Sequence, residues 1–430
     1  MKYAKYRINM IDNNSFTEKD NALCNLGESN QELAMDKIFL DIGIDESDVI
    51  YIKRDENFEK NIYNENITMP VHIGLVNENK HRLPLPTNFK PIFISVCIYN
   101  DFFDKSPETL EYFKKNEPIG CRDEYTKDLL LKYGVKAYLM GCFTVCFNQR
   151  TIKPDDGKVF IIDIPEEAND CIPETIKKDA VYLQNSIPFD VYPVTEEEDI
   201  NKKEIANKRL ELYKREAKLV ITGRLHVVIP CMAMGIPVIM IRNNYDTRFG
   251  WIDKYLPLYT LDDLHDINWN PMAIDLSFAR KKIIEYLRKS LYGITNAENE
   301  LVELDEFYCN RNRTVLNKKI YDAVNKAVVS IGCDDFTYAI WGAGTHCHFV
   351  YDVITKLYPN AKLVLVVDKF VKGERYGVTI VNGEQVDKIN FDHMFITTLP
   401  GKNEAINKMK ELLGENARKK YSVITTFVRS

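Results

Sequence analysis

Residues 218–241 read KLVITGRLHVVIPCMAMGIPVIMI, and this stretch decides the fold class. The apolar run before Gly223 has the length and the Val and Ile content of a strand that is buried on both faces. A tight turn at Gly223, a short helix and a second apolar run from Pro237 complete a strand–helix–strand unit. Such units build α/β domains with mostly parallel sheets.

Polar side chains occupy the point where the first of these strands ends and the helix begins. Thr222, Gly223, Arg224 and His226 lie where a helix dipole and the ligand crevice of an open α/β sheet coincide. Arg224 places a permanent cation beside a histidine that ordinarily titrates near neutral pH, so we expect the pair to bind an anion and move a proton. The alternative is that His226 only caps or packs the helix.

The same alternation of short apolar runs and amphipathic stretches extends along almost the whole chain. In 202–217, apolar residues recur at intervals of three or four, which predicts a helix. Ser106 followed by Pro107 predicts another helix start. The pattern therefore predicts an α/β protein. The expected buried strands are 91–99, 158–163, 218–223, 237–241, 338–341 and 363–368.

Two shifts in composition divide the chain. The polar stretch 148–157 separates two apolar regions, and 290–335 is a charged, helical pattern that ends near Gly332. We therefore expect an N-terminal α/β lobe at 1–155, a second α/β lobe at 156–290, a helical connector at 291–335 and a C-terminal Rossmann-like domain at 336–430.

Composition limits the functional class. The 430 residues carry a net charge of −6 and are 45% apolar, which suits several buried cores and argues against a dedicated nucleic-acid binder. The N-terminus lacks the apolar stretch of a signal peptide. The segment 226–241 is broken by Pro230, Gly235 and Pro237, so we expect no membrane-spanning helix. Ten cysteines without a CxxC pair are typical of reduced thiols, and we expect a cytoplasmic protein.

The stretch NLGESNQELAM, residues 25–35, joins a glycine turn to a helix. Ser29 and Glu32 have the spacing of a capping box, so we expect the helix to begin at Asn30. Free amides near Gly27 and the positive end of the helix would form a site for an anion or a substrate hydroxyl. The alternative is an ordinary loop with a good cap.

A second turn, PIGCRDEYT at 118–126, joins a short strand to a helix. Arg122 then lies at the carboxyl end of the strand, where open α/β sheets bind ligands, and arginine suits phosphate and carboxylate groups. The alternative is a surface pair of Arg122 and Asp123.

A polar loop, 242–251, follows the second strand of the opening unit. Its Arg248 would reach the crevice near Arg224. Its Tyr245 and Trp251 would either stack on a sugar ring or pack in the core.

Four stretches, in this order, resemble the polysaccharide pyruvyl transferase family: NLGESNQELAM, PIGCRDEYT, GCFTVCF at 141–147, and VITGRLHVVIPCMAMGIPVIMI. The resemblance covers about residues 20–260, and the RLH sequence (224–226) is its most specific part. It implies a two-lobed Rossmann-like fold similar to GT-B glycosyltransferases, with the site between the lobes. Members transfer a pyruvyl group from phosphoenolpyruvate to a sugar, usually as a cyclic ketal, and release phosphate.

The resemblance assigns the family's arginine and histidine to Arg224 and His226, our expected catalytic residues, and its RD-motif arginine to Arg122. Phosphoenolpyruvate carries a carboxylate and a phosphate, which two or more arginines would hold. Addition at C2 needs a proton delivered to C3 and one removed from the sugar hydroxyl, and we expect His226 to transfer it. The expected substrate-binding residues are Arg122, Arg248, Gly27, Asn30 and Gly223. We expect no metal and no cofactor besides this donor substrate.

The C-terminal region has a glycine turn of its own. Residues 338–348 read YAIWGAGTHCH, and the later run LVLVVD ends at Asp368, roughly the spacing of a ribose-binding acid. Cys347 replaces the third glycine of GxGxxG, which weakens a dinucleotide assignment. Two interpretations stay open: a nucleotide site at Gly342, Gly344 and Asp368, or a structural or partner-binding lobe.

Two other functions also stay open at this point. A GT-B-like glycosyltransferase would use Arg224 against the diphosphate of a nucleotide sugar. A non-catalytic glycan-assembly or nucleotide-sensing module would depend on the C-terminal region. For the pyruvyl transferase, we expect the acceptor to be a glycan or a lipid-linked sugar of a bacterial-type surface polysaccharide. We expect no nucleic-acid partner. Peripheral contact with membrane-bound glycan machinery stays open. The acceptor sugar, its linkage and the oligomeric state do not follow from the sequence.

Overall fold

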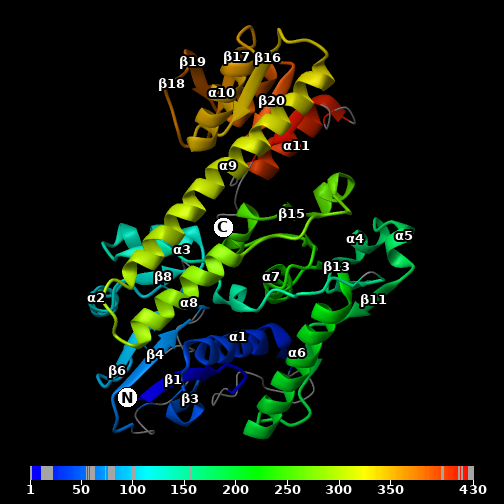
Figure 1. The fold of residues 1–430 in the computed structure, drawn as a ribbon. Helices are drawn as coiled ribbons and strands as arrows, with labels where there is room; N and C mark the ends of the chain where they lie inside the picture. Colours follow the sequence, from blue (N-terminus) through cyan, green and yellow to red (C-terminus); the bar gives the residue numbers. More distant parts are fainter. Residues whose placement is uncertain are drawn as a thin grey trace. The chain divides into compact units, whose positions relative to one another are not determined.

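The computed structural model divides the chain into two compact units, Met1–Tyr308 and Cys309–Ser430. The first unit contains two lobes, each built on a parallel sheet, and the second unit contains a third sheet (Figure 1). The structure describes residues 2–10, 23–54, 56, 58, 63–72, 74–75, 83–98, 103–154, 156–398, 401–414, 417 and 420–424.

The first lobe is built on a four-stranded parallel sheet in the order β3-β1-β4-β6. All five residues of β4 are buried, as expected for a sheet that is covered on both faces. A bridge between Val96 and Cys121 links the segment after β6 to the parallel pair β8 and β9. The bounds are β1 Lys2–Arg7, β3 Val49–Lys53, β4 Ile67–Val71, β6 Phe89–Phe93, β8 Ile119–Cys121 and β9 Ala137–Leu139.

The expected strand 91–99 is interrupted at Ser95, whose φ of 48° breaks the extended run. The segment therefore forms the end of β6 and the separate β7 (Cys97–Ile98), which pairs with β5 (Gly74–Leu75). Tyr99, the last residue of the expected strand, lies outside the described residues.

Among the described residues of this lobe there are three α-helices, and the first begins earlier than the sequence predicts. The Asn25 side chain accepts a hydrogen bond from the Gly27 amide at 3.0 Å, so α1 begins at Leu26 rather than at Asn30. Ser29 is therefore buried inside the first turns of the helix and does not cap it. Helix α2 begins at the predicted proline. The bounds are α1 Leu26–Ile42, α2 Pro107–Lys115 and α3 Glu124–Lys132.

The second lobe holds a five-stranded parallel sheet in the order β11-β10-β13-β14-β15, and the predicted unit at 218–241 forms β13, α7 and β14. The chain runs from β10 to β11 on one side and from β13 to β14 on the other, so the topological switch point lies between β10 and β13. The bounds are β10 Lys158–Ile162, β11 Ala180–Leu183, β13 Ala217–Thr222, β14 Val238–Ile241, β15 Leu258–Tyr259, α4 Glu166–Asp170, α5 Glu174–Lys177, α6 Glu196–Glu216 and α7 Leu225–Ala233.

Strand pairing and helix packing join the two lobes. Strand β2 (Leu23–Asn25) of the first lobe pairs antiparallel with β12 (Ser186–Pro188) of the second. Helix α1 packs against both α6 and α7. Helix α8 (Ser277–Leu291) leaves the second lobe and packs on β4 and β6 (Figure 1). The start of α1 is therefore held against the start of α7.

The second unit contains a six-stranded sheet in the order β18-β19-β17-β16-β20-β21, which is parallel except for the β18–β19 pair. The expected connector contains the long helix α9, and the division between the two units falls within that helix. Asp155, at the expected lobe boundary, lies outside the described residues. The bounds are α9 Glu298–Ile331, β16 Thr337–Trp341, α10 Thr345–Leu357, β17 Lys362–Val367, β18 Glu374–Arg375, β19 Val378–Val381, β20 His393–Ile396, α11 Lys402–Leu413 and β21 Tyr421–Val423.

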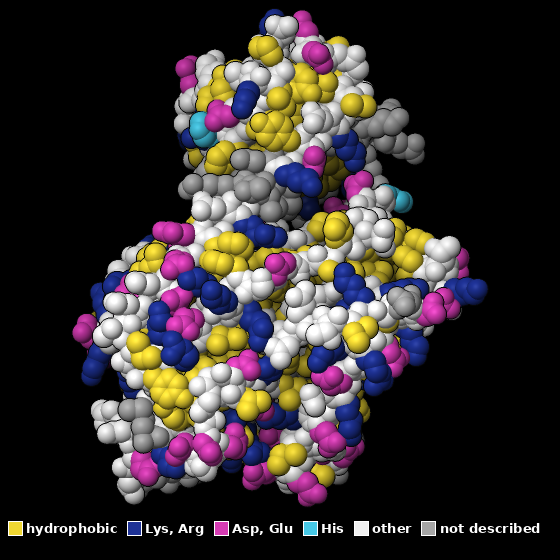
Figure 2. Space-filling view, viewed as in Figure 1, with side chains coloured by type: hydrophobic (Ala, Val, Ile, Leu, Met, Phe, Trp, Pro, Cys, Tyr) yellow, Lys and Arg dark blue, Asp and Glu magenta, His cyan; other side chains and the backbone are white. Residues whose placement is uncertain are grey.

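The surface carries both signs of charge. Figure 2 shows basic and acidic side chains interspersed over the face in view rather than gathered into a field of one sign. Seven of the ten cysteines are buried, as expected of thiols that pack in cores. Within the described ranges, no helix is long and apolar enough to cross a membrane.

Candidate active site

The switch point of the second sheet brings Asp163, Gly223 and Arg224 together. The Arg224 Nε donates to Asp163 Oδ2 at 2.7 Å, and its Nη2 lies 3.4 Å from the Ser186 hydroxyl. A Cβ on Gly223 would lie 2.5 Å from the Asp163 carbonyl oxygen, so only glycine fits there. Asp163 has a φ of 46°, in the left-handed region. The two strand ends therefore form a tight junction that directs Arg224.

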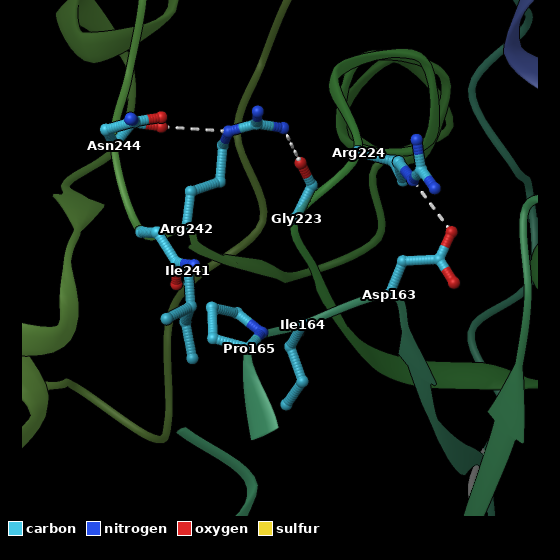
Figure 3. Close-up of a pocket in the computed structure, with 9 residues that line it drawn as sticks. Asp163, Ile164, Pro165, Gly223, Arg224, Ile241, Arg242 and Asn244 are labelled. Atoms are coloured by element: carbon cyan, nitrogen blue, oxygen red, sulfur yellow. Dashed lines mark hydrogen bonds and ion pairs between the residues drawn. The ribbon is translucent and has the colours of Figure 1, made fainter. Parts of the chain in front are cut away.

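A crevice of about 460 Å³ opens at this switch point, where the ends of β10, β13 and β14 line it. Figure 3 shows the guanidinium of Arg242 on one side of Gly223 and that of Arg224 on the other. Arg242 donates to the main-chain oxygens of Gly223 and Asn244. The charged lining of the crevice consists of two arginines and the Asp163 carboxylate.

His226 lies in the first turn of α7, where its φ of −85° and ψ of 19° depart from helical values. The Asn30 Nδ2 donates to the main-chain oxygen of His226 at 2.8 Å. A Cβ on Gly27 would lie 2.9 Å from the His226 Cβ, so the glycine permits the close approach of α1 and α7. The Nε2 atom lies 3.8 Å from Cys142 Sγ. Residues of the first lobe thus position a histidine of the second.

Arg122 follows β8, as predicted, but only 5% of it is exposed. Its Nη2 lies 3.5 Å from Gln31 Oε1, while its Nε and the Asn30 Oδ1 are buried without a hydrogen-bond partner among the described residues. The alternative of a surface pair is wrong, because Asp123 is also buried and caps α3 by accepting from the Thr126 amide at 2.8 Å. An unpaired buried group is costly unless water or a ligand completes its hydrogen bonds.

The electrostatic setting of His226 differs from the expectation. Burial lowers the pKa of His226 well below its usual value, and the positive charges of Arg122 and Arg248 lower it further. The expectation of titration near neutral pH is therefore wrong, and the cations that lower the pKa are Arg122 and Arg248 rather than Arg224. The ring is neutral at pH 7 and able to accept a proton.

Arg248 forms a two-point contact with Asp246, with Nε 2.8 Å from Oδ1 and Nη2 2.5 Å from Oδ2. It lies near enough to His226 to lower the pKa of the ring. Tyr245 and Trp251 are 6% and 0% exposed, so they belong to the core and offer no platform for a sugar.

Three further polar residues lie at strand ends and were not predicted as site residues. His72 follows β4 at the switch point of the first sheet, between β1 and β4, and burial together with Arg122 lowers its pKa to about 3. Asp163 follows β10 and Arg242 follows β14. The available signal was the same for all three: a polar residue directly after a buried apolar run.

The predicted residues therefore fall into two neighbouring groups. Arg122, Arg248, Asn30 and Gly27 gather around His226 at the junction of the lobes. Gly223 and Arg224 line the crevice.

The C-terminal candidates lie together at the carboxyl edge of the third sheet. Gly342 has a φ of 112°, and Gly344 precedes α10. One oxygen of Asp368 accepts from the Ala343 amide at 2.8 Å, and the other accepts from two amides of the following loop. The Asp368 carboxylate therefore already accepts hydrogen bonds from three main-chain amides. Nucleotide binding at this turn stays a prediction. Among the described residues, no three His, Cys, Asp or Glu side chains are placed to hold a metal ion.

Two lobes, each built on a parallel sheet with polar residues after its strand ends, define a two-lobed, Rossmann-like α/β protein. The profile described as polysaccharide pyruvyl transferase matches residues 25–245, slightly more than half of the chain. The chain belongs to the polysaccharide pyruvyl transferase family and is a transferase.

No curated protein matches the chain. A solved structure from Listeria monocytogenes, provisionally assigned as a UDP-N-acetylglucosamine 2-epimerase, is similar over 69% of this chain and 98% of its own, with 12% identity and a TM-score of 0.36.

Proposed function

We propose that this protein transfers a pyruvyl group from phosphoenolpyruvate to a sugar of a bacterial-type surface polysaccharide, or of its precursor, and releases phosphate. The family supports the class of reaction. The observation that carries the proposal is the placement of His226. Its main chain is bound by Asn30, and its neutral ring lies near the buried Arg122, whose Nε is unpaired among the described residues.

The arginines of the site would bind the anionic groups of the donor. Phosphoenolpyruvate presents a carboxylate and a phosphate, and arginine binds both with paired hydrogen bonds. Arg122 and Arg224 would hold these two groups, and Arg248 would assist. Burial of Arg122 strengthens such a contact because water competes less there. The Asn30 side chain and amides near Gly27 and Gly223 would complete the hydrogen bonds.

The neutral ring of His226 would transfer the proton. His226 would take the proton of a sugar hydroxyl as the hydroxyl oxygen bonds to C2 of the donor, and would return it to C3, which becomes a methyl group. A second hydroxyl would then displace phosphate from C2 and close the ketal, and its proton would leave with the phosphate. The negative donor would raise the pKa of His226, which makes the ring a stronger base once the donor is bound. Such a group contributes about 10²–10⁴-fold to rate.

We also propose that the reaction needs no metal or cofactor and takes place in the cytoplasm. The acceptor would be a glycan or a lipid-linked sugar, with peripheral contact to membrane-bound glycan machinery. The family match favours this reaction over a nucleotide-sugar glycosyltransferase and over a non-catalytic module.

The test is incubation of the full chain with phosphoenolpyruvate and a panel of glycan acceptors. We expect phosphate release that depends on both substrates, together with the mass increment of a pyruvyl group on one acceptor. Release of nucleoside diphosphate from a nucleotide sugar, without any pyruvyl transfer, would support the glycosyltransferase instead.

A further inference from the structure

The stretch GCFTVCF, residues 141–147, carries part of the family resemblance, but the proposed reaction uses none of its residues. It contains the short 3-10 helix η4 (Phe143–Cys146), which packs against α1, α7 and α8 at the junction of the lobes. Cys142 directly precedes η4 and is buried. Its Sγ lies 3.8 Å from Nε2 of His226 and 3.1 Å from Oγ1 of Thr144. The stretch thus brings a thiol against the ring that would transfer the proton.

The main chain on both sides of Cys142 is held in place. The Ser95 hydroxyl donates to the Gly141 oxygen at 2.8 Å and accepts from the Phe143 amide at 2.9 Å. Ser95 itself has a φ of 48°, a costly conformation for a residue with a side chain. Gly141 has a φ of 73°, and a Cβ there would lie 3.1 Å from the Trp251 ring. The position of the sulfur is therefore fixed by contacts that do not involve the histidine.

The Nε2 edge of the His226 ring faces the interior of the protein, because Cys142 and Thr144 are both 0% exposed. A neutral imidazole carries one hydrogen and one lone pair on its two nitrogens, and the partner of one nitrogen sets which form is present. A substrate would therefore have to reach the ring at Nδ1. His226 can take a proton from that substrate only while the hydrogen is on Nε2 and the lone pair is on Nδ1.

We propose that Cys142 is a positioning residue that holds His226 in this tautomer: its sulfur accepts the Nε2 hydrogen and leaves the lone pair on Nδ1. The inference rests on the proposed pyruvyl transfer and names the nitrogen that acts as the base. The thiol hydrogen points to Thr144 Oγ1, so a sulfur lone pair faces the ring. The proton passes from the sugar hydroxyl to Nδ1 and then from Nδ1 to C3, while the Nε2 hydrogen stays in place. The sulfur contact strengthens while the ring is positive.

NMR of the full chain with nitrogen-labelled histidines tests the tautomer, because a ring nitrogen that carries a hydrogen differs in chemical shift from one that does not. At pH 7 we expect a hydrogen on Nε2 of His226 and none on Nδ1. Loss of the resonance in His226→Gln identifies it among the seven histidines. Cys142→Ala removes the acceptor and should give a mixture of the two tautomers. Cys142→Ser leaves similar space but keeps an acceptor, so it should favour the wild-type tautomer more than alanine does.

Steady-state kinetics give a second measurement. Cys142→Ala should lower kcat of pyruvyl transfer about tenfold, because part of the ring population then lacks a lone pair on Nδ1 and the sulfur contact is lost. Its KM for phosphoenolpyruvate should stay near that of wild type, since the arginines are unchanged. Cys142→Ser should recover part of kcat. Cys146→Ala is the matched control, because it removes an equally buried thiol from the same stretch and leaves Cys142 in place; its tautomer and kcat should match wild type.

The tautomer is measured without substrates, so the two hypotheses can fail separately. A wild-type ring with its hydrogen on Nδ1 would overturn the inference, and this holds even if a variant does not fold. The wild-type tautomer in folded Cys142→Ala, or an equal loss of kcat in Cys142→Ala and Cys146→Ala, would overturn it as well. The expected tautomer in a wild-type protein that transfers no pyruvyl group would instead count against the proposed function.

Discussion

Arg224 and Asp163 join the carboxyl ends of two neighbouring strands: the guanidinium Nε donates to the carboxylate Oδ2 across 2.7 Å. The same oxygen also accepts the Asn185 amide at 3.0 Å. Because the Arg224 side chain is 40% exposed, the pair adds little to stability and acts mainly on the direction of the arginine. Arg224 is thereby held at the edge of the crevice, two residues before His226.

Two substitutions of Asp163 should distinguish the contribution of its charge to stability from the contribution of its backbone conformation. Asp163→Asn keeps a side chain that tolerates the φ of 46°, so its free energy of unfolding should fall by no more than about 1 kcal/mol. Asp163→Val should lower the free energy of unfolding by about a further 1–2 kcal/mol, because a β-branched residue is strained in the left-handed region. Urea unfolding of both variants gives the comparison. Equal stability of the two would show that the backbone at this junction is unstrained.

Gly27 should be sensitive to a single methyl group. Gly27→Ala places a Cβ 2.9 Å from the His226 Cβ and 3.1 Å from the Asn25 side-chain oxygen that caps α1. We expect a loss of about 1–3 kcal/mol in stability and a slower transfer reaction, because α1 and α7 must move apart. The rate of phosphate release measures the second effect.

Gly43→Asn is the control for this change. Gly43 ends the same helix at a φ of 85° with no atom within 4 Å of an added Cβ, and asparagine tolerates that conformation. Both stability and rate should stay near those of wild type. Wild-type transfer by Gly27→Ala would refute the packing role assigned to Gly27.

Much of this architecture could be predicted because its signals are local. The strand–helix–strand unit at 218–241 and the positions of Arg122 and Arg224 at strand ends follow from short apolar runs and the turns after them. In parallel sheets, such ends gather at one edge whatever the rest of the chain does.

The contacts of the site could not be predicted in this way. Asn30 and His226 are 196 residues apart and meet only through the packing of α1 on α7. The start of α1 is fixed by Asn25, which ends β2 where that strand pairs with the second lobe, so the helix begins before the capping-box residues. The depressed pKa of His226 likewise depends on burial and on Arg122 and Arg248, which come from distant segments.

Substitution of Arg122 should change both the affinity for phosphoenolpyruvate and the pKa of His226. Arg122→Gln removes a buried cation, so we expect phosphoenolpyruvate to bind at least about tenfold more weakly. It should also raise the pKa of His226, since one of the charges that lower it is gone. Calorimetry measures the first effect and NMR titration of the histidines the second. Arg122→Lys keeps the charge and should leave the pKa of His226 low while still weakening the donor contact. A His226 pKa that is the same in wild type and in the Gln variant would contradict this arrangement.

The titration of His226 should respond to the donor. In the protein alone the ring stays neutral as the pH falls through 6.5, because its pKa is depressed. Phosphoenolpyruvate should raise that pKa, so binding takes up a proton and tightens as the pH falls through the raised value toward the pKa of the free protein. NMR of labelled histidines follows both states, with His226→Gln identifying the resonance among seven. A titration near pH 6.5 without donor, or one that the donor leaves unchanged, would contradict the assigned electrostatics.

The most direct test of the central claim is the rate of pyruvyl transfer by His226→Gln, measured by mass spectrometry of the acceptor with phosphoenolpyruvate as donor. Glutamine is neutral and of similar size, so folding and donor binding should persist, as circular dichroism and calorimetry would check. We predict a rate about 10²–10⁴-fold below that of wild type. Transfer by the folded variant at the wild-type rate would contradict the role of His226 in moving the proton.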